Sequence, residues 1–240
     1  MKLYFGDIHN HCGITYGFGG LENALKNAQS HLDFVAITGH AFWPDLPKRD
    51  ERTAFLVDFH EKGFQKLRDH FPEIKNTINS FNRPDEFTTF YSYEMHSSKY
   101  GDHHLVSGDN DIPLVYGDSP AEWFEKIKNY KDTTIVPHHI AYTPGYRGIS
   151  WSDFDSDICK VVEVCSKHGV SMSDKHEISY YHNMGCRDEH NSVYEGLRQG
   201  KIFGFVGSTD HHAGYPGSYG DCLLACLANS NTRSDIMDAI

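Results

Sequence analysis

The sequence predicts an α/β fold with a largely parallel sheet that closes into a barrel. Short apolar runs alternate with helical patterns from one end of the chain to the other, which is typical of successive strand–helix units. Roughly seven or eight such units are what a barrel requires. The 240 residues contain no internal repeat, low-complexity stretch or obvious linker, so we expect a single domain over residues 1–240. The last residues form only a short helical pattern, which leaves open a continuation beyond Ile240.

The predicted strands are short apolar runs, several of them rich in β-branched and aromatic residues. They cover residues 3–8, 34–37, 87–93, 105–106, 133–136, 161–165, 202–206 and 222–227.

Helices are predicted in the intervals between these strands. Apolar residues recur at one-face helical spacing over 21–28, directly after two glycines. Residues 119–122 combine a serine cap, a first-turn proline and a capping-box glutamate. A third helical pattern over 193–197 stops at Gly200. The interval 41–86 is longer than one crossover and is expected to hold one or two helices and a loop at 81–84.

Composition points to a metal site and away from several classes of protein. Histidine, the commonest metal ligand, accounts for 17 of the 240 residues. The formal charge is −11 and no run of Lys or Arg exceeds two residues, which disfavours general nucleic-acid binding. The chain has no apolar run long enough to span a membrane and no signal-peptide core at its start, so we expect a cytoplasmic protein without membrane contact. The six cysteines have neither CxxC nor dense disulfide spacing, which favours free thiols.

Metal-ligand residues follow five of the predicted strands at the point where each strand ends. These residues are His9 and His11, His40, Glu94, His138 and His139, and Asp210 with His211 and His212. Parallel strands of a barrel open their carboxyl ends on one face, so residues far apart in the sequence meet at one site. His9 and His11 are two residues apart, which places both side chains on one face of an extended strand. The sequence therefore predicts a metal centre at this face.

The same residues carry a resemblance to the polymerase and histidinol phosphatase (PHP) superfamily. The matching segments, in the order of the superfamily, are 7–11 (DIHNH), 36–40 (AITGH), Glu94, 102–106 (DHHLV), 136–138 (VPH) and 207–212 (GSTDHH). Segments 162–164, 168–169 and 200–208 are most similar to an uncharacterised branch of this superfamily. The resemblance covers nearly the whole chain and implies a metal-dependent hydrolase with a distorted (β/α)7 barrel.

Carried over residue by residue, the resemblance implies eight metal ligands. They are His9, His11, His40, Glu94, His103, His138, Asp210 and His212, with Glu94 as the bridging carboxylate. His103 is chosen over His104 because it stands two residues before Leu105, and His138 over His139 because it directly follows the strand end. His139 is then expected next to the ligands or facing the substrate.

Two departures from the superfamily pattern bear on the number of metal ions. Residues 12–20 contain no acid, and Gly39 stands where an aspartate is commoner. Both changes remove carboxylate from the region of a third ion, so we expect two or three divalent ions, with manganese, iron and zinc all compatible with the ligands.

A second group of residues is expected to bind substrate. Arg147 follows a flexible loop just after His138, and its guanidinium suits bidentate capture of phosphate. Lys167 and His168 are further candidates. Glu163 lies in a buried-looking strand, where a carboxylate needs a metal or an ion-pair partner.

These residues predict a phosphoester hydrolase whose nucleophile is a metal-bridging hydroxide. Glu94, Asp210 and His139 are its candidate catalytic residues. The expected substrate is a small anionic molecule, a phosphorylated metabolite or a nucleotide. One alternative is hydrolysis of a C–N or carboxylic ester bond, and another is a noncatalytic metal-binding accessory module. The natural substrate and the oligomeric state do not follow from the sequence.

Overall fold

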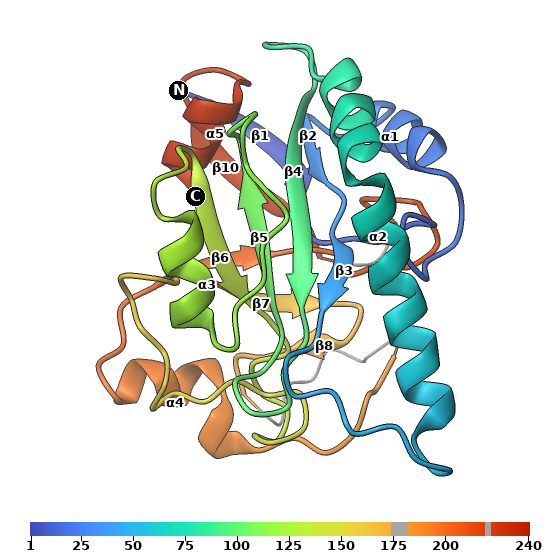
Figure 1. The fold of residues 1–240 in the computed structure, drawn as a ribbon. Coiled ribbons are helices and arrows are strands. Elements are labelled where there is room, and N and C mark those ends of the chain that lie inside the picture. The colour runs from blue at the N-terminus through green and yellow to red at the C-terminus, as the bar shows by residue number, and fades with distance from the viewer. Residues whose placement is uncertain (174–181, 219–221) are drawn as a thin grey trace.

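In the described part of the chain, the larger of two sheets contains seven strands and is curled (Figure 1). The computed structural model describes residues 1–173, 182–218 and 222–240. In spatial order the strands are β10 (Leu224–Ala228), β1 (Lys2–Asp7), β2 (Phe34–Ala36), β4 (Thr88–Met95), β5 (His103–Ser107) and β6 (Thr133–Pro137), with β3 (Gly39–Phe42) paired to the end of β4.

A second, smaller sheet faces the inside of this curl. Its strands are β8 (Gly169–Val170), β7 (Val161–Ser166) and β9 (Gly204–Gly207), of which β7 and β9 are parallel. A parallel bridge between Asn10 and His211 joins the chain just after β1 to the chain just after β9. The ends of the two sheets are therefore held together where the ligand-type residues follow the strands.

The prediction of a closed, largely parallel barrel is wrong on two points: the sheet that the structure describes does not close, and several neighbouring strands are antiparallel. Over the described residues the strands form two separate sheets, and β10–β1, β4–β5 and β5–β6 are antiparallel ladders. Residues 96–102 leave too little chain between β4 and β5 for a helical crossover, so the chain reverses direction there. The result is a mixed α/β fold with a half-barrel sheet.

Helices cover the outer face of the curled sheet. On this face lie α1 (Leu21–Gln29), α2 (Ala54–Phe81) and α3 (Pro120–Ile127). The short helix α5 (Arg233–Ala239) packs instead on β10, and α4 (Val193–Arg198) packs on the 3-10 turn at Glu189–Asn191. The predicted cap of α3 is confirmed, because the Ser119 hydroxyl accepts a hydrogen bond from the backbone N–H of Glu122. The interval 41–86 holds β3 and a single long helix, α2, which runs along one side of the molecule (Figure 1).

Alternation along the strands separates two apolar cores. The inner core lies within the curl and includes Ile8, Phe34, Phe90, Val106, Val136, Val161, Val206 and Leu224. The outer core lies under the helices and includes Leu25, Leu67, Tyr91, Tyr93, Leu105, Trp123 and Ile135. Neighbouring residues of one strand thus belong to different cores, as Phe90 and Tyr91 do. The inner face also carries the polar residues described below.

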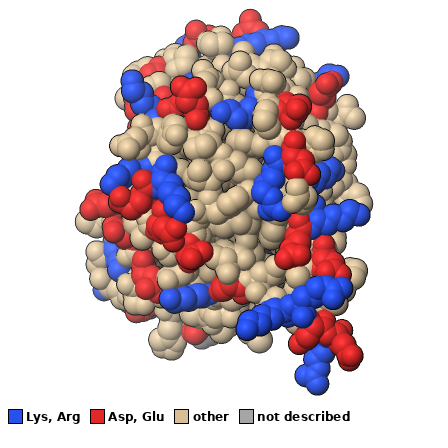
Figure 2. All heavy atoms as spheres, viewed as in Figure 1, with Lys and Arg blue, Asp and Glu red and all other residues tan. Residues whose placement is uncertain are grey.

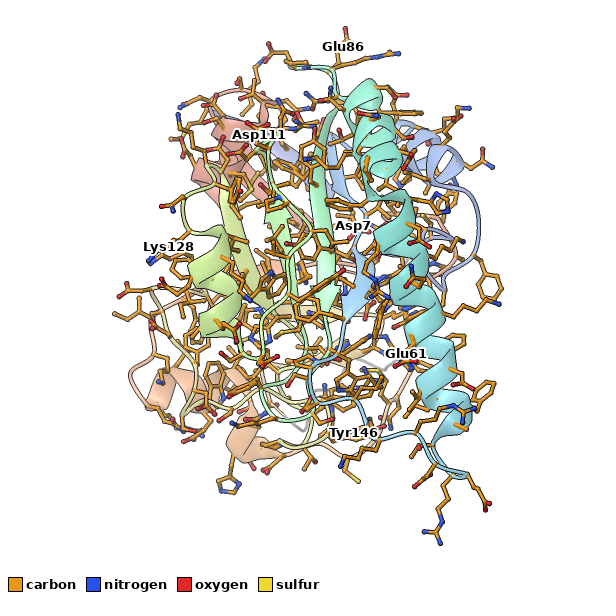
Figure 3. The ribbon with its side chains drawn as sticks, in the orientation of Figure 1. Asp7, Glu61, Glu86, Asp111, Lys128 and Tyr146 are labelled. Carbon is orange, nitrogen blue, oxygen red and sulfur yellow. A yellow bond between two sulfur atoms is a disulfide. The ribbon has the colours of Figure 1, made fainter. Side chains whose placement is uncertain are left out.

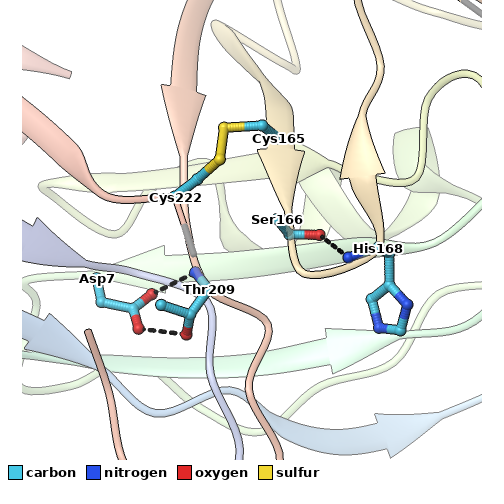
Figure 4. The surroundings of a disulfide bond; sticks show 6 residues. All are labelled: Asp7, Cys165, Ser166, His168, Thr209 and Cys222. Atoms are coloured by element: carbon cyan, nitrogen blue, oxygen red, sulfur yellow. Dashed lines mark hydrogen bonds between the residues drawn. A yellow bond between two sulfur atoms is a disulfide. The ribbon is translucent and has the colours of Figure 1, made fainter. Parts of the chain in front are cut away.

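Two of the cysteines expected as free thiols form a disulfide. Cys165 in β7 and Cys222 before β10 are bonded, with their Cα atoms 5.9 Å apart (Figure 4). Spacing along the chain could not reveal this pair, because the two residues are 57 positions apart and meet only when β7 lies beside the segment that follows β9. Disulfides are rare in the reducing cytoplasm, so this pair gives no support to the expected cytoplasmic location, which stays a prediction.

Removing this disulfide with Cys222→Ser is expected to lower the free energy of unfolding by roughly 4 kcal/mol, because the bond closes a long loop of the unfolded chain. Urea unfolding under non-reducing conditions measures the difference. Cys186→Ser is the matched control, since Cys186 is exposed and free. Identical unfolding of the Cys222→Ser variant and the unsubstituted chain would contradict the pairing.

The surface is charged with both signs. On the face shown in Figure 2, basic and acidic side chains are interspersed and flank a broad uncharged region. Among the helices that the structure describes, none has the length and the apolar run needed to cross a bilayer.

Candidate metal centre

Ligand-type side chains gather near the carboxyl ends of strands of both sheets and near the start of β5. Figure 1 shows where two of these strands, β3 and β4, end. His9 and His11 follow β1, His40 lies in β3, Glu94 in β4, His104 in β5, His138 and His139 after β6, and Asp210 and His212 after β9. All of these residues are buried except His212, whose side chain is about one-third exposed. The structure therefore brings together seven of the eight expected ligands, and His103 is the exception.

Glu94 lies at the centre of this cluster. Its Oε2 is 3.3 Å from Nε2 of His11 and 3.5 Å from Nε2 of both His9 and His40. Its Oε1 is 3.2 Å from Nε2 of His138. The two oxygens face different imidazoles, which is the arrangement that a carboxylate needs to bridge two cations.

Asp210 is the second buried carboxylate of the cluster. Its Oδ1 lies 3.0 Å from Nε2 of His11 and 3.4 Å from Nε2 of His9. Its Oδ2 lies 3.0 Å from Nε2 of His168 and 3.6 Å from Nε2 of His139. Burial raises the pKa of Asp210, but His9 and His168 outweigh it and hold the pKa well below its usual range. Asp210 is therefore an ionised oxygen donor.

Asp7 holds the segment that carries Asp210. Its carboxylate accepts hydrogen bonds from the hydroxyl and the backbone N–H of Thr209, at 2.6 and 3.1 Å (Figure 4). The backbone N–H of Gly217 donates a further bond at 2.9 Å. Burial raises the pKa of Asp7 to about 6, against the opposing effect of these hydrogen bonds. The end of β1 and the segment after β9 are thus tied together directly beside the cluster.

Two residues of the cluster have a strained backbone. His139 and Asp210 have φ values of 57° and 51°, in the left-handed region that non-glycine residues rarely adopt. Such conformations persist only where the surrounding structure holds them, and they are common at functional sites.

The residues present fit divalent cations. Three buried atoms, His11 Nδ1, Glu94 Oε2 and His104 Nε2, have no hydrogen-bond partner among the described residues, and buried polar atoms are costly without one. Ligand atoms lie within 4.8 Å of one another in the groups His9–His104–His138, His9–His11–Asp210, His11–His40–His212 and His40–Glu94–His96. Imidazole nitrogen and carboxylate oxygen suit zinc, iron and manganese.

The alternation of β5 favours His104 over His103. His104 is paired with Glu94 across the β4–β5 ladder, and its Nδ1 lies 3.2 Å from Nδ1 of His138. His103 points to the other face of the strand, where its Nδ1 lies 2.9 Å from the carbonyl oxygen of Gly101. The choice of His103 is therefore corrected to His104 in the candidate set.

Glu163 belongs to the site and contacts a candidate ligand rather than the centre of the cluster. Its Oε2 accepts a hydrogen bond from Nδ1 of His9 at 2.7 Å, and both side chains are buried. Burial lowers the pKa of His9. The nearby carboxylates of Glu163 and Asp210 raise this pKa by more than burial lowers it, so it lies well above the usual value. With Nδ1 held by Glu163, Nε2 of His9 faces Glu94 and Asp210.

Glu163→Gln is expected to weaken metal binding about ten- to a hundredfold, because His9 loses the charged acceptor that orients it. Competition with a chelator of known affinity measures the change, and circular dichroism checks the fold. Glu86→Gln, at an exposed position, is the control. An unchanged metal affinity would show that Glu163 has no part in orienting His9.

A cavity of about 320 Å³ opens onto the cluster. It is lined by Tyr16, His40, His60, Glu94, His96, His139, Arg147, Lys167, His168, His182, Met184, Asp210 and His212. The three expected substrate-binding residues, Arg147, Lys167 and His168, all lie in this lining. Sequence reasoning missed Tyr16, which lies in a loop, and His60, which lies in α2. Candidate residues were selected at the ends of predicted strands, and neither residue lies at such an end. His96 follows Glu94 by two residues, and the strand-end pattern could have included it.

Arg147 is held in the cavity by a buried carboxylate. Its Nη1 donates to Oδ2 of Asp102 at 2.8 Å and lies 3.3 Å from Nδ1 of His96. Burial raises the pKa of Asp102, but His96 and Arg147 together bring the pKa well below its usual value. Tyr16 completes the array, with its hydroxyl 2.8 Å from Nε2 of His96. Arg147 thus presents an oriented cation beside the candidate metal centre.

Comparison with known proteins identifies the fold. No family model matches the chain, and no curated protein matches it either. Among solved structures, a two-domain protein of Bacteroides vulgatus containing a predicted PHP-like metal-dependent phosphoesterase has a TM-score of 0.54 and 12% identity, over 99% of this chain and 62% of that one. Endonuclease Q of Pyrococcus furiosus has a TM-score of 0.53 and 14% identity, over 100% of this chain and 56% of that one.

The chain therefore has the PHP-like fold that its motifs predicted. It spans 62% or less of the length of these solved proteins. A likeness that extends over 99–100% of this chain matches the extent of the sequence resemblance, which also runs from the first strand to the last ligand segment.

The prediction that the protein does not bind nucleic acid, which was drawn from its net charge, is wrong. A structure of endonuclease Q, with a TM-score of 0.54 to this chain, contains a 27-mer duplex substrate with an abasic lesion at the active site. A protein with this fold can therefore act on DNA. The net charge of −11 is a sum over the whole surface, whereas a phosphate at the cavity meets the local charges of Arg147 and Lys167.

Proposed function

We propose that this protein is a metal-dependent phosphoesterase. The observation that carries the proposal is the position of Glu94, a buried carboxylate whose two oxygens face separate groups of histidines. Divalent ions bound there would lower the pKa of a bound water and neutralise charge that develops on a phosphoryl oxygen. The candidate ligands are His9, His11, His40, Glu94, His104, His138, Asp210 and His212.

The remaining polar groups of the cavity suit a phosphorylated substrate. Arg147, oriented by Asp102, and Lys167, whose Nζ lies 3.1 Å from Nδ1 of His212, place two cations near the cluster. His139 and His168 lie against Oδ2 of Asp210, where they can orient the carboxylate or contact the substrate. The cavity volume admits a small phosphorylated metabolite or one nucleotide unit, and that unit can belong to a nucleic-acid strand.

The test begins with the metal content of the purified protein. Elemental analysis is expected to find about two to three equivalents of manganese, iron or zinc, as the number of nitrogen and oxygen ligands suggests. Phosphate release is then assayed over sugar phosphates, nucleotides and single-stranded and duplex DNA. Amine or carboxylate release from amides and esters would indicate the C–N or ester hydrolase instead. A metal-loaded protein that hydrolyses none of these would indicate the noncatalytic module.

A further inference from the structure

A series of aromatic rings leads from the candidate metal centre to the surface. The ring of His11 stacks on that of His40, with centroids 4.1 Å apart, and His40 stacks on Tyr16 at 4.0 Å. Tyr16 then contacts Phe59 at 4.7 Å, and Phe59 lies nearly parallel to Phe55 at 6.1 Å. The outer end of the series therefore reaches α2, on the rim of the cavity.

Phe55 and Phe59 are unusually exposed for phenylalanine. They lie one turn apart on the first turns of α2, and 84% and 44% of their surfaces are accessible. Phe59 also contacts His60, which lines the cavity, so the pair adjoins the mouth of the site. Figure 3 shows this end of α2, marked by Glu61, on the same lower part of the molecule as Tyr146. Large apolar side chains at the rim of a polar cavity indicate a contact with a ligand.

The surroundings of the pair suit a ring that carries phosphate. Lys62 follows Phe55 and Phe59 on the same face of α2 and is exposed. Phe18 is 76% exposed, and its backbone N–H donates to the carbonyl of His212, a residue of the cavity lining. One ring, that of Tyr16, separates Phe59 from the candidate ligand His40, with centroid distances of 4.7 Å to Phe59 and 4.0 Å to His40.

We propose that Phe55 and Phe59 form a stacking site for the nucleobase of the phosphoester held at the metal centre. This inference rests on the proposed function and names its substrate class as a nucleotide unit, free or within a strand. The base stacks on the exposed phenylalanine rings, the sugar passes Tyr16, and the phosphate lies near Glu94 and Arg147. Stacking of this kind accepts any base, since every base has a flat π-face.

Binding is measured on protein carrying Asp210→Asn, which limits cleavage during titration. The probes are a fluorescein-labelled single strand of about eight adenylates and a strand of equal length made of abasic units. Phe55→Ala with Phe59→Ala is expected to weaken binding of the adenylate strand about tenfold, the usual effect of losing one stacked base, and to leave the abasic strand unaffected. Phe59→Trp should retain binding. Phe205→Ala, an exposed phenylalanine on β9, is the matched control, and thermal unfolding confirms that each variant is folded.

A second comparison distinguishes the two sources of the nucleotide. If AMP competes better than ribose 5-phosphate, the natural ligand is a free nucleotide. If the base strengthens binding only when it is part of a strand, the ligand is a nucleic-acid end or loop. Equal binding with and without the base, in both formats, would overturn the stacking site. If the unsubstituted enzyme hydrolyses phosphoesters in that case, the proposed function stands alone. If base-dependent binding appears without any hydrolysis, the stacking site stands and the proposed function fails.

Discussion

Replacing Glu94 with glutamine is expected to lower phosphoesterase turnover by on the order of a thousandfold or more. Glu94 is the residue of the cluster whose Oε1 and Oε2 lie within 3.5 Å of four imidazoles, those of His9, His11, His40 and His138. Glutamine keeps the shape of the side chain but removes its negative charge, so it cannot bridge two cations. Bound metal is expected to fall together with turnover.

The measurement pairs elemental analysis with a turnover assay on the same preparation. Glu61→Gln is the matched control, because Glu61 lies on the exposed side of α2 near the cavity and has no part in the cluster. Circular dichroism checks that the fold is retained. A Glu94→Gln protein with full metal content and near-normal turnover would remove Glu94 from the centre of the mechanism.

His104→Ala is expected to reduce both metal content and turnover, the latter by on the order of a hundredfold or more, whereas His103→Ala costs at most about tenfold. His104 lies on the inner face of β5, with its ring 4.4 Å from that of His9. His103 lies on the outer face, where burial is the main cause that lowers its pKa to about 4. Its loss removes packing and a bond to Gly101 rather than a ligand.

The adjacent pair is its own control, because the two variants delete the same side chain at neighbouring buried positions. Metal content and turnover are measured for both, with thermal unfolding to separate stability from metal binding. Loss of metal from His103→Ala but not from His104→Ala would restore the original choice. His139→Ala extends the comparison, since the φ of His139 and its contact with Asp210 suggest a role beside the metals.

Local patterns were sufficient to predict most strands and the α/β class of the chain, but not the half-barrel that the strands form. Both strands predicted at 87–93 and 133–136 are found, with β4 running on through Glu94 to Met95 and β6 ending at Pro137, directly before His138. The reason is physical. Short apolar runs determine strands locally, and the residues that follow a strand in the sequence necessarily lie at its carboxyl end. The PHP-like motifs extend that reasoning along the whole chain, which explains the agreement in fold.

Residues of β5 show where local pattern was insufficient. The sequence left a candidate ligand at His103 or His104, and counting from Leu105 selected His103, whereas the structure places His104 on the side of the cluster. Leu105 belongs to the outer core under the helices, whereas Val106 belongs to the inner core, so His104 shares the inner face. Which face of a strand is inner depends on the register of its partner, and here the pairing of Glu94 with His104 decides it.

Sequence by itself thus determined which residue types stand at the strand ends and, through them, the metal chemistry that we propose for this protein. Tertiary structure alone decided the open half-barrel, the Cys165–Cys222 bond, the contact of Glu163 with His9, and the entry of Tyr16 into the cavity. These features depend on contacts between segments far apart in the chain. Such contacts are set by strand register and by the docking of α2 and the loops, and no local pattern of residues encodes that geometry.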